Sequence, residues 1–217
     1  FSKAAEIDIT SALTVGGAVT TVDGAIIKGG TLSVLGTGTF AANSVKTNVL
    51  SLSNGAKATF AGDNALKQLD LAANSAVSIN SGATLTLAQA AVGSAQSVFT
   101  GAGTLALNKS GMTVNSKLSD LGGLSVLQSA TLSGTAQVGT ITVGNGALTV
   151  NAEAQANTVS IASGARLIQN ADMTVGTLSF GANSGSTLTV NKTLNITQKI
   201  DTASNTLNGT GTINLSG

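Results

Sequence analysis

The feature that most constrains this chain is a short pattern that recurs from one end to the other. Each unit is a triplet in which a small, mostly polar residue separates two apolar residues, and successive units are spaced by about 18 residues on average. The triplets of this series begin at Leu13, Leu32, Leu50, Leu69, Leu85, Leu105, Leu124, Ile141, Val159, Leu178, Leu194 and Ile213. An irregular globular fold does not keep such a spacing, so the pattern indicates a repeat architecture.

The local pattern is that of short strands separated by sharp turns. Alternation of apolar and polar residues over three to five positions is typical of a β-strand with one buried face. Second triplets, beginning for example at Ala58, Met112, Ala130 and Leu148, lie between members of the first series. Turn signals separate the triplets at Asp23-Gly24, Asn54-Gly55, Ser81-Gly82, Asn145-Gly146 and Ser163-Gly164. Sustained helical periodicity is absent from the sequence, which excludes a helical bundle.

Short strands that recur with two or three turns per period predict a β-solenoid. We expect an all-β, right-handed parallel β-helix of about 18 residues per coil and roughly twelve coils, forming a single domain over residues 1–217. Right-handed winding is expected of parallel strands joined by crossovers. A left-handed helix stays open as the alternative, because a coil of this length also corresponds to three hexapeptides.

The strand register is ambiguous between residues 60 and 110. Leu69 and Leu85 fit the series by spacing, whereas Val77-Ser78-Ile79 fits better by the Ser81-Gly82-Ala83 turn that follows it. Residues 88–99 fit neither type of strand, and we expect a loop or a short helical excursion there. An excursion from a regular scaffold is a place where function often lies.

Composition excludes several chemistries. The chain has no His and no Cys, which removes imidazole and thiolate nucleophiles and metal ligands, and its net charge of +1 gives no electrostatic footprint for nucleic acid. It has neither Tyr nor Trp to stack on sugars or bases, and no apolar stretch long enough to span a bilayer. The carboxylates are dispersed along the repeat: Glu6, Asp8, Asp23, Asp63, Asp70, Asp120, Glu153, Asp172 and Asp201. We therefore predict no catalytic, cofactor or metal site, no enzymatic activity and no nucleic-acid partner.

Threonine supplies the most regular outward feature. The residue just before the buried triplet is threonine at eight positions, which stacked coils would place in a ladder: Thr31, Thr84, Thr104, Thr140, Thr158, Thr177, Thr193 and Thr212. One interpretation is an ice-binding face, because such ladders resemble those of antifreeze proteins. The alternative, which we favour, is that threonine is a good strand residue that pairs well with itself across strands.

The ends of the sequence raise the question of partners. The first residues, 1–8, are only slightly charged, and the last residues, Gly211 to Gly217, end inside a repeat with no polar or helical cap. Such an end predicts either a piece of a longer rod or an end that pairs with a neighbouring subunit. The second possibility would make the chain the protomer of a head-to-tail filament.

Several units resemble those of a known family. Gly30-Thr31-Leu32-Ser33-Val34, Gly103-Thr104-Leu105-Ala106-Leu107 and Gly176-Thr177-Leu178-Ser179-Phe180 resemble the Gly-Thr-Leu units of bacterial autotransporter passenger domains, as do residues 145–150 and 209–217. The resemblance implies a right-handed β-helix that is secreted and acts in adhesion or self-association at a bacterial outer surface.

We therefore expect a non-enzymatic structural protein of the extracellular space or the bacterial outer cell surface. It would function in adhesion, self-association or matrix and fibre formation. Its partners would be other copies, associating laterally or end to end, or a host or neighbouring-cell surface. A filament protomer and an ice-binding protein remain the alternatives, and a polysaccharide-active β-helix is the least favoured.

Overall fold

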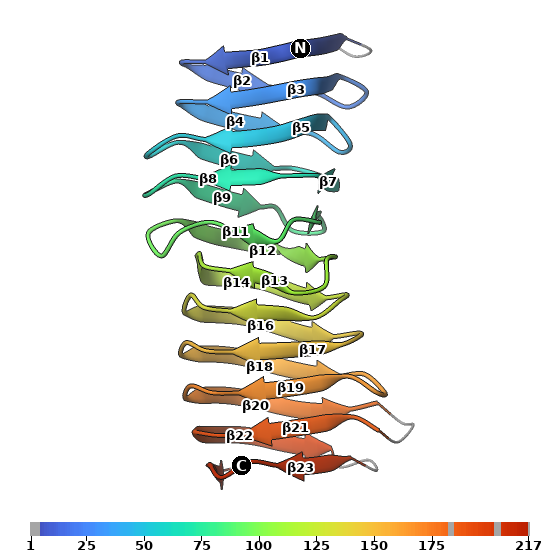
Figure 1. Cartoon of the computed structure of the whole chain (residues 1–217), viewed down its shortest axis with the longest axis vertical. Coiled ribbons are helices and arrows are strands. Elements are labelled where there is room, and N and C mark those ends of the chain that lie inside the picture. The colour runs from blue at the N-terminus through green and yellow to red at the C-terminus, as the bar shows by residue number, and fades with distance from the viewer. Residues whose placement is uncertain (1–4, 182–184, 202–204, 217) are drawn as a thin grey trace.

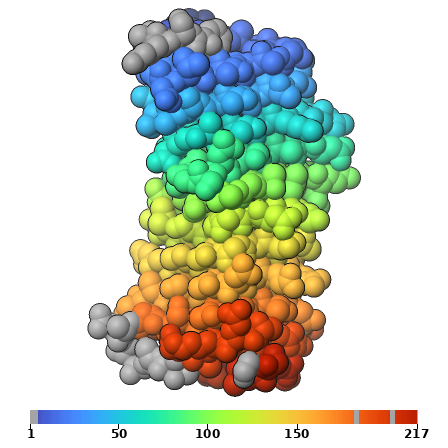
Figure 2. Space-filling model, turned by 180° about the vertical axis from the view of Figure 1, so that it is seen from behind, coloured from blue at the N-terminus to red at the C-terminus, as the bar shows by residue number. Residues whose placement is uncertain are grey.

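In the computed structural model, which describes residues 5–181, 185–201 and 205–216, the chain winds into a β-solenoid (Figure 1). It makes about 11 coils of about 19 residues, and the described residues contain strands and turns but no helix. The front strands in Figure 1 run to the left and the rear strands to the right while the chain descends, so the winding is right-handed as expected. The coils follow one another in chain order along the long axis of the rod (Figure 2). Residues 1–4 and Gly217, on which the prediction about the chain ends partly depends, lie outside the described ranges.

The described strands pair in parallel and form three hydrogen-bonded sheets. The first contains β1 (Glu6–Val15), β3 (Ile26–Val34), β5 (Val45–Leu52) and β8 (Leu69–Leu71). The second contains β2 (Ala18–Thr20), β4 (Thr37–Phe40), β6 (Lys57–Phe60), β7 (Asn64–Leu66), β9 (Ala76–Ile79), β10 (Thr84–Leu87), β12 (Val98–Leu107), β14 (Lys117–Val126), β16 (Ala136–Val143), β18 (Ala154–Ile161), β20 (Met173–Phe180), β22 (Thr193–Asp201) and β24 (Thr212–Leu215). The third contains β11 (Ala91–Val92), β13 (Met112–Val114), β15 (Ala130–Leu132), β17 (Ala147–Val150), β19 (Arg166–Gln169), β21 (Thr187–Val190) and β23 (Thr206–Asn208).

Each coil passes through three faces in turn, because the long strands bend and contribute to two faces. Face 1 consists of β2, β4, β6, β9 and β24 with the N-terminal parts of β12, β14, β16, β18, β20 and β22. Face 2 consists of the N-terminal parts of β1, β3 and β5, then β7 and β10, then the C-terminal parts of β12, β14, β16, β18, β20 and β22. Face 3 consists of the C-terminal parts of β1, β3 and β5, then β8, β11, β13, β15, β17, β19, β21 and β23.

The core is a stack of aliphatic side chains that point inward from all three faces. Leu32, Leu50 and Leu69 occupy equivalent positions on consecutive coils of face 3, and all three are fully buried. Polar or small residues at the alternate positions point outward, which is the period of two that a strand imposes. Phe40 and Phe60 stack on neighbouring coils of face 1, with ring centroids 5.4 Å apart. The triplets thus form the core as the sequence predicts.

The long strand of each coil spans a different pair of faces in the two halves of the rod. In the N-terminal half it bends from face 2 to face 3, and Gly29 at this bend has a φ of 91°, which favours glycine. In the C-terminal half it bends from face 1 to face 2, at glycines such as Gly122. The change occurs over β7 to β11, where each strand is short and serves one face. This is the segment in which the sequence left the register ambiguous.

The structure resolves that ambiguity by placing all three candidate strands on different faces. Leu69 lies on face 3, Val77 on face 1 and Leu85 on face 2. Residues 88–99 hold β11, a turn and the start of β12, joined by irregular chain and without a helix, so of the two expected alternatives it is the helix that is not found there. The Gln89 side chain replaces strand pairing here: its amide nitrogen donates to the carbonyl oxygen of Leu69, and its oxygen accepts from the Leu69 N–H.

The predicted series of triplets is not one column. It follows face 3 to Leu69, continues on face 2 from Leu85 to Leu178, and continues on face 1 from Leu194. Leu178 pairs with Ile200, and Leu194 pairs with Met173. The two shortest steps of the series, Leu69 to Leu85 and Leu178 to Leu194, are the points at which it moves to another face. Each move omits part of a coil, which explains why the mean spacing of the series is slightly shorter than the true coil of about 19 residues.

Candidate functional site

The eight threonines expected in one ladder lie on three faces. Thr31 is on face 3, where it pairs with Ala12 and Val49. Thr193 and Thr212 pair with each other on face 1. The remaining five lie on face 2: Thr84, Thr104, Thr140, Thr158 and Thr177. A single ladder of eight is therefore wrong, because the series on which it was based changes face twice.

The five threonines of face 2 belong to a larger surface of small uncharged side chains. They form an outer rank that runs through six coils and is interrupted by Gly123, between Thr104 and Thr140. An inner rank lies two residues further along each strand. Together the two ranks, which we call the hydroxyl surface, consist of Thr84, Thr86, Thr104, Ala106, Gly123, Ser125, Thr140, Thr142, Thr158, Ser160, Thr177 and Ser179. None of these positions carries a charge or a large side chain, and Thr104, Gly123, Ser125, Thr140 and Thr142 line a depression of about 230 Å³ in the middle of the surface.

Charged residues border the hydroxyl surface at both ends of face 2. On the C-terminal side, the outer rank continues into Lys199 and the inner rank into Asp201, which form an ion pair at 2.9 Å. On the N-terminal side, Asp63 accepts a hydrogen bond from the N–H of Thr84 at 2.7 Å. Further along face 2, beyond β5 and β7, Lys28 pairs with Glu6 and lies 3.8 Å from Asp8. The hydrogen bond and charge of Glu6 raise the pKa of the Lys28 amine above its ordinary value. The Glu6 and Asp8 charges thus have an ion-pair partner on the next coil.

Two further ladders of hydroxyl side chains were not predicted from the sequence. Thr113, Thr131 and Thr149 are stacked on face 3 of consecutive coils. Thr39 and Thr59 are paired on face 1. The second triplets, beginning at Met112, Ala130 and Leu148, carry the first of these ladders and were the available signal.

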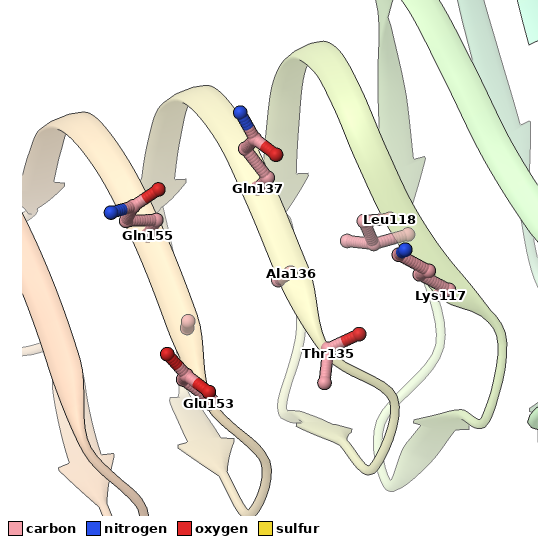
Figure 3. Close-up of a pocket in the computed structure, with 8 residues that line it drawn as sticks. Lys117, Leu118, Thr135, Ala136, Gln137, Glu153 and Gln155 are labelled. Atoms are coloured by element: carbon pink, nitrogen blue, oxygen red, sulfur yellow. The ribbon is translucent and has the colours of Figure 1, made fainter.

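Asparagine and glutamine side chains also align on neighbouring coils. Asn170 donates from its side-chain amide to Asn151 at 2.9 Å, and Asn191 donates in turn to Asn170 at 2.8 Å. These three residues form an asparagine ladder at the corner that follows face 3. On face 1, Gln137 pairs in register with Gln155, and both side chains project outward in the same direction from neighbouring strands (Figure 3).

A groove follows the corner between faces 1 and 2 in the C-terminal half of the rod. Three adjoining depressions of about 180, 270 and 300 Å³ make up the groove, and Gln137 lines all three. Gln155 lines the first two, and Asn157 lines the second and third. Lys117 and Glu153 line the groove at the start of face 1, Asp120 lines it at the corner, and Gln198 lines its C-terminal end. Amide side chains from successive coils therefore share one concave surface.

The carboxylates stay dispersed in the folded chain. Among the described residues, no three Asp or Glu side chains come close enough together to hold a metal ion. The described part of the chain also contains no helix of the length and apolarity needed to cross a membrane. The surfaces that gather side chains of one kind are thus the hydroxyl surface and the amide-lined groove.

Fold and repeat together define the chain as a β-solenoid repeat protein. Comparison with known protein families, with curated proteins and with solved structures gives no match to the chain.

Proposed function

We propose that the protein is a non-enzymatic structural rod of the extracellular space or the bacterial outer cell surface, which acts in adhesion and self-association through its lateral faces. The observation that carries the proposal is the hydroxyl surface: two ranks of small uncharged side chains over six coils, with charged residues at both ends. The other faces differ, since Lys57 and Lys117 project from face 1, and Arg166 from face 3.

A surface of small side chains without charge is suited to contact with an equivalent surface on a second rod. Two such surfaces can approach closely, because no long side chain must be ordered or desolvated on contact. Six coils at about 4.8 Å and strands of about four residues give a contact of roughly 400 Å² per rod. The total of about 800 Å² is below the roughly 1,000 Å² that a stable specific interface buries, so a single contact is weak. Many rods on one surface would bind through avidity, which suits adhesion between cells or to a host surface.

Sedimentation velocity over a concentration series tests the proposal. The wild-type chain should associate reversibly, and Thr140→Lys with Thr158→Lys should abolish association by placing two charges in the hydroxyl surface. The control is Thr131→Lys with Thr149→Lys, which introduces the same two charges on neighbouring coils of face 3. A wild-type chain that stays monomeric throughout, or a control that loses association equally, would contradict the proposal.

Ice binding is the second candidate, and it is favoured by a specific feature of the same surface. Thr140 and Thr142 place two threonines on one strand, in register with Thr158 and Ser160 of the next coil. Thr84 and Thr86 form a second such pair, in which Thr84 is in register with Thr104 and Thr86 with Ala106. Thermal hysteresis of the wild-type chain, lost in the face 2 variant and kept in the face 3 variant, would support this candidate. Association without hysteresis would favour the structural rod.

A further inference from the structure

The amide-lined groove differs from the rest of the surface in its chemistry. Outward positions on the strands are mostly threonine and serine, which are favoured in sheets or tolerated there, whereas asparagine is depleted and glutamine is not enriched. Gln137, Gln155 and Asn157 nevertheless come from two consecutive coils and line adjoining parts of one concave surface. Strand propensity does not explain this choice of residues.

Hydrogen bonding between amide side chains of neighbouring coils does not explain the presence of the two glutamines either. Asn195 and Asn214, the two asparagines that continue the same rank after Thr174, bond to each other at 2.9 Å. The side chains of Gln137 and Gln155, in contrast, make no hydrogen bond to any described residue, although they are adjacent and in register. Both amides therefore offer a donor and an acceptor to a ligand (Figure 3).

The floor and the far end of the groove are shaped by the backbone. Gly122 and Gly139 line the floor, and a Cβ at either position would meet a carbonyl of the preceding coil. At the far end, β22 has one more residue than β20 between their paired positions, and this bulge contains Thr197 and Gln198. Bulges commonly re-aim a side chain at a site. Here Gln198 lines the groove and accepts a hydrogen bond from Thr177 at 3.3 Å.

We infer that this groove binds a neutral, extended β-1,4-linked glycan that lies along the rod axis. Amides hydrogen-bond to sugar hydroxyls in both directions, as donor and as acceptor. Consecutive coils present equivalent side chains about every 4.8 Å, a spacing close to the length of one sugar ring in an extended chain. The groove extends over successive coils from β12 to β22, and this direction along the rod fits the extended ribbon of a β-1,4 chain better than the coil of an α-1,4 chain.

Charge and backbone pairing favour this ligand over others. Lys117 and Glu153 bring opposite charges to the groove and Asp120 adds a second carboxylate, so the lining has no excess of positive charge that would attract a polyanion. The strands that form it, β14, β16, β18 and β20, are each paired on both sides, so they offer no free edge to an extended peptide. Since aromatic residues are absent from the lining, binding depends on hydrogen bonds and should be of modest affinity. No residue of the hydroxyl surface lines the groove, although the two surfaces adjoin where Thr177 donates to Gln198.

The test is an NMR titration of the whole ¹⁵N-labelled chain with neutral hexasaccharides. Cellohexaose or mannohexaose should shift the side-chain NH₂ signals of Gln137 and Gln155, while maltohexaose, hexagalacturonate and a neutral Gly-Ser peptide should not. Gln137→Ala with Gln155→Ala should weaken binding about tenfold or more, because two amides and their hydrogen bonds are lost. The control is Gln96→Ala with Gln128→Ala, which removes two exposed amides that line no part of the groove and should leave binding unchanged.

Three results would overturn the inference. The first is that neither β-1,4 hexasaccharide shifts the two amides. The second is that the charged, α-linked or peptide probe binds as well as the β-1,4 probes, which would indicate a different ligand. The third is that the groove variant binds as tightly as the control variant. The readout is the side-chain amide signal and not assembly, so a negative result in this titration does not bear on the self-association test.

Discussion

Substitution of Gly122 by alanine tests the close approach of coils at the corner between faces 1 and 2. A Cβ at this position would overlap the carbonyl group of Ala102 and the carbonyl oxygen of Gly103, which belong to the backbone of the preceding coil. Backbone atoms cannot rotate away, so relief requires β12 and β14 to move apart and stretch their hydrogen bonds. Overpacking of this kind costs about 2 to 3 kcal/mol in the free energy of unfolding.

The matched control is Gly144→Ala, at which a Cβ meets only one atom, at an ordinary contact distance of 3.5 Å. That substitution should stabilise the chain by about 0.4 to 1 kcal/mol, since alanine restricts the unfolded chain. The two variants should thus differ by about 3 kcal/mol, or about two orders of magnitude in the folding equilibrium. Urea denaturation followed by far-ultraviolet circular dichroism measures the difference, and hydrogen exchange shows whether the loss is confined to β12 and β14. Equal urea midpoints for the two variants would refute the predicted overlap.

Two further predictions concern polar contacts in the N-terminal half. Gln89→Ala should destabilise the chain by about 1 to 2 kcal/mol, because it leaves the N–H and carbonyl of Leu69 without the amide that bonds both, whereas exposed Gln96→Ala should have no measurable effect by urea denaturation. Glu6→Gln should lower the pKa of Lys28 toward its ordinary value of 10.5, as measured by NMR titration. Because the folded pKa is raised, the ion pair contributes to stability at neutral pH, and this contribution is lost as the pH rises through the folded value; an unchanged Lys28 titration in the variant would contradict the pairing.

The sequence predicts the coil but not the way in which columns continue from coil to coil. The triplets at Leu32, Leu50 and Leu69 identify a real column, since they share one face and one spacing. Every face uses the same alternation of apolar and polar residues, however, so a triplet does not reveal its face. The series therefore changes face after Leu69 and after Leu178 without any change in local pattern. The only sign of the change of face in the sequence is the shorter spacing between successive triplets at each of these points.

The candidate sites depend on register, which is why the sequence finds them only in part. Five threonines of face 2 are correctly grouped, because the spacing from Thr84 to Thr177 follows one column. The groove combines face 1 with the corner to face 2, and its side chains come from different positions in the repeat. Gln137 and Gln155 lie one coil apart and could have been paired from spacing alone. Both glutamines share a concave surface with Asn157 and Gln198. This arrangement depends on the bend of the long strands between faces 1 and 2 and on the bulge in β22, which the sequence does not reveal.

Small-angle X-ray scattering over a concentration series tests the central claim, association through lateral faces, most directly. A rod of about 11 coils at about 4.8 Å is roughly 50 Å long. Lateral association predicts that the cross-sectional radius of gyration rises with concentration by a larger factor than the maximum dimension. The Thr140→Lys, Thr158→Lys variant should keep the single-rod cross-section throughout. A growing maximum dimension with a constant cross-section, or scattering that does not change with concentration, would contradict the claim.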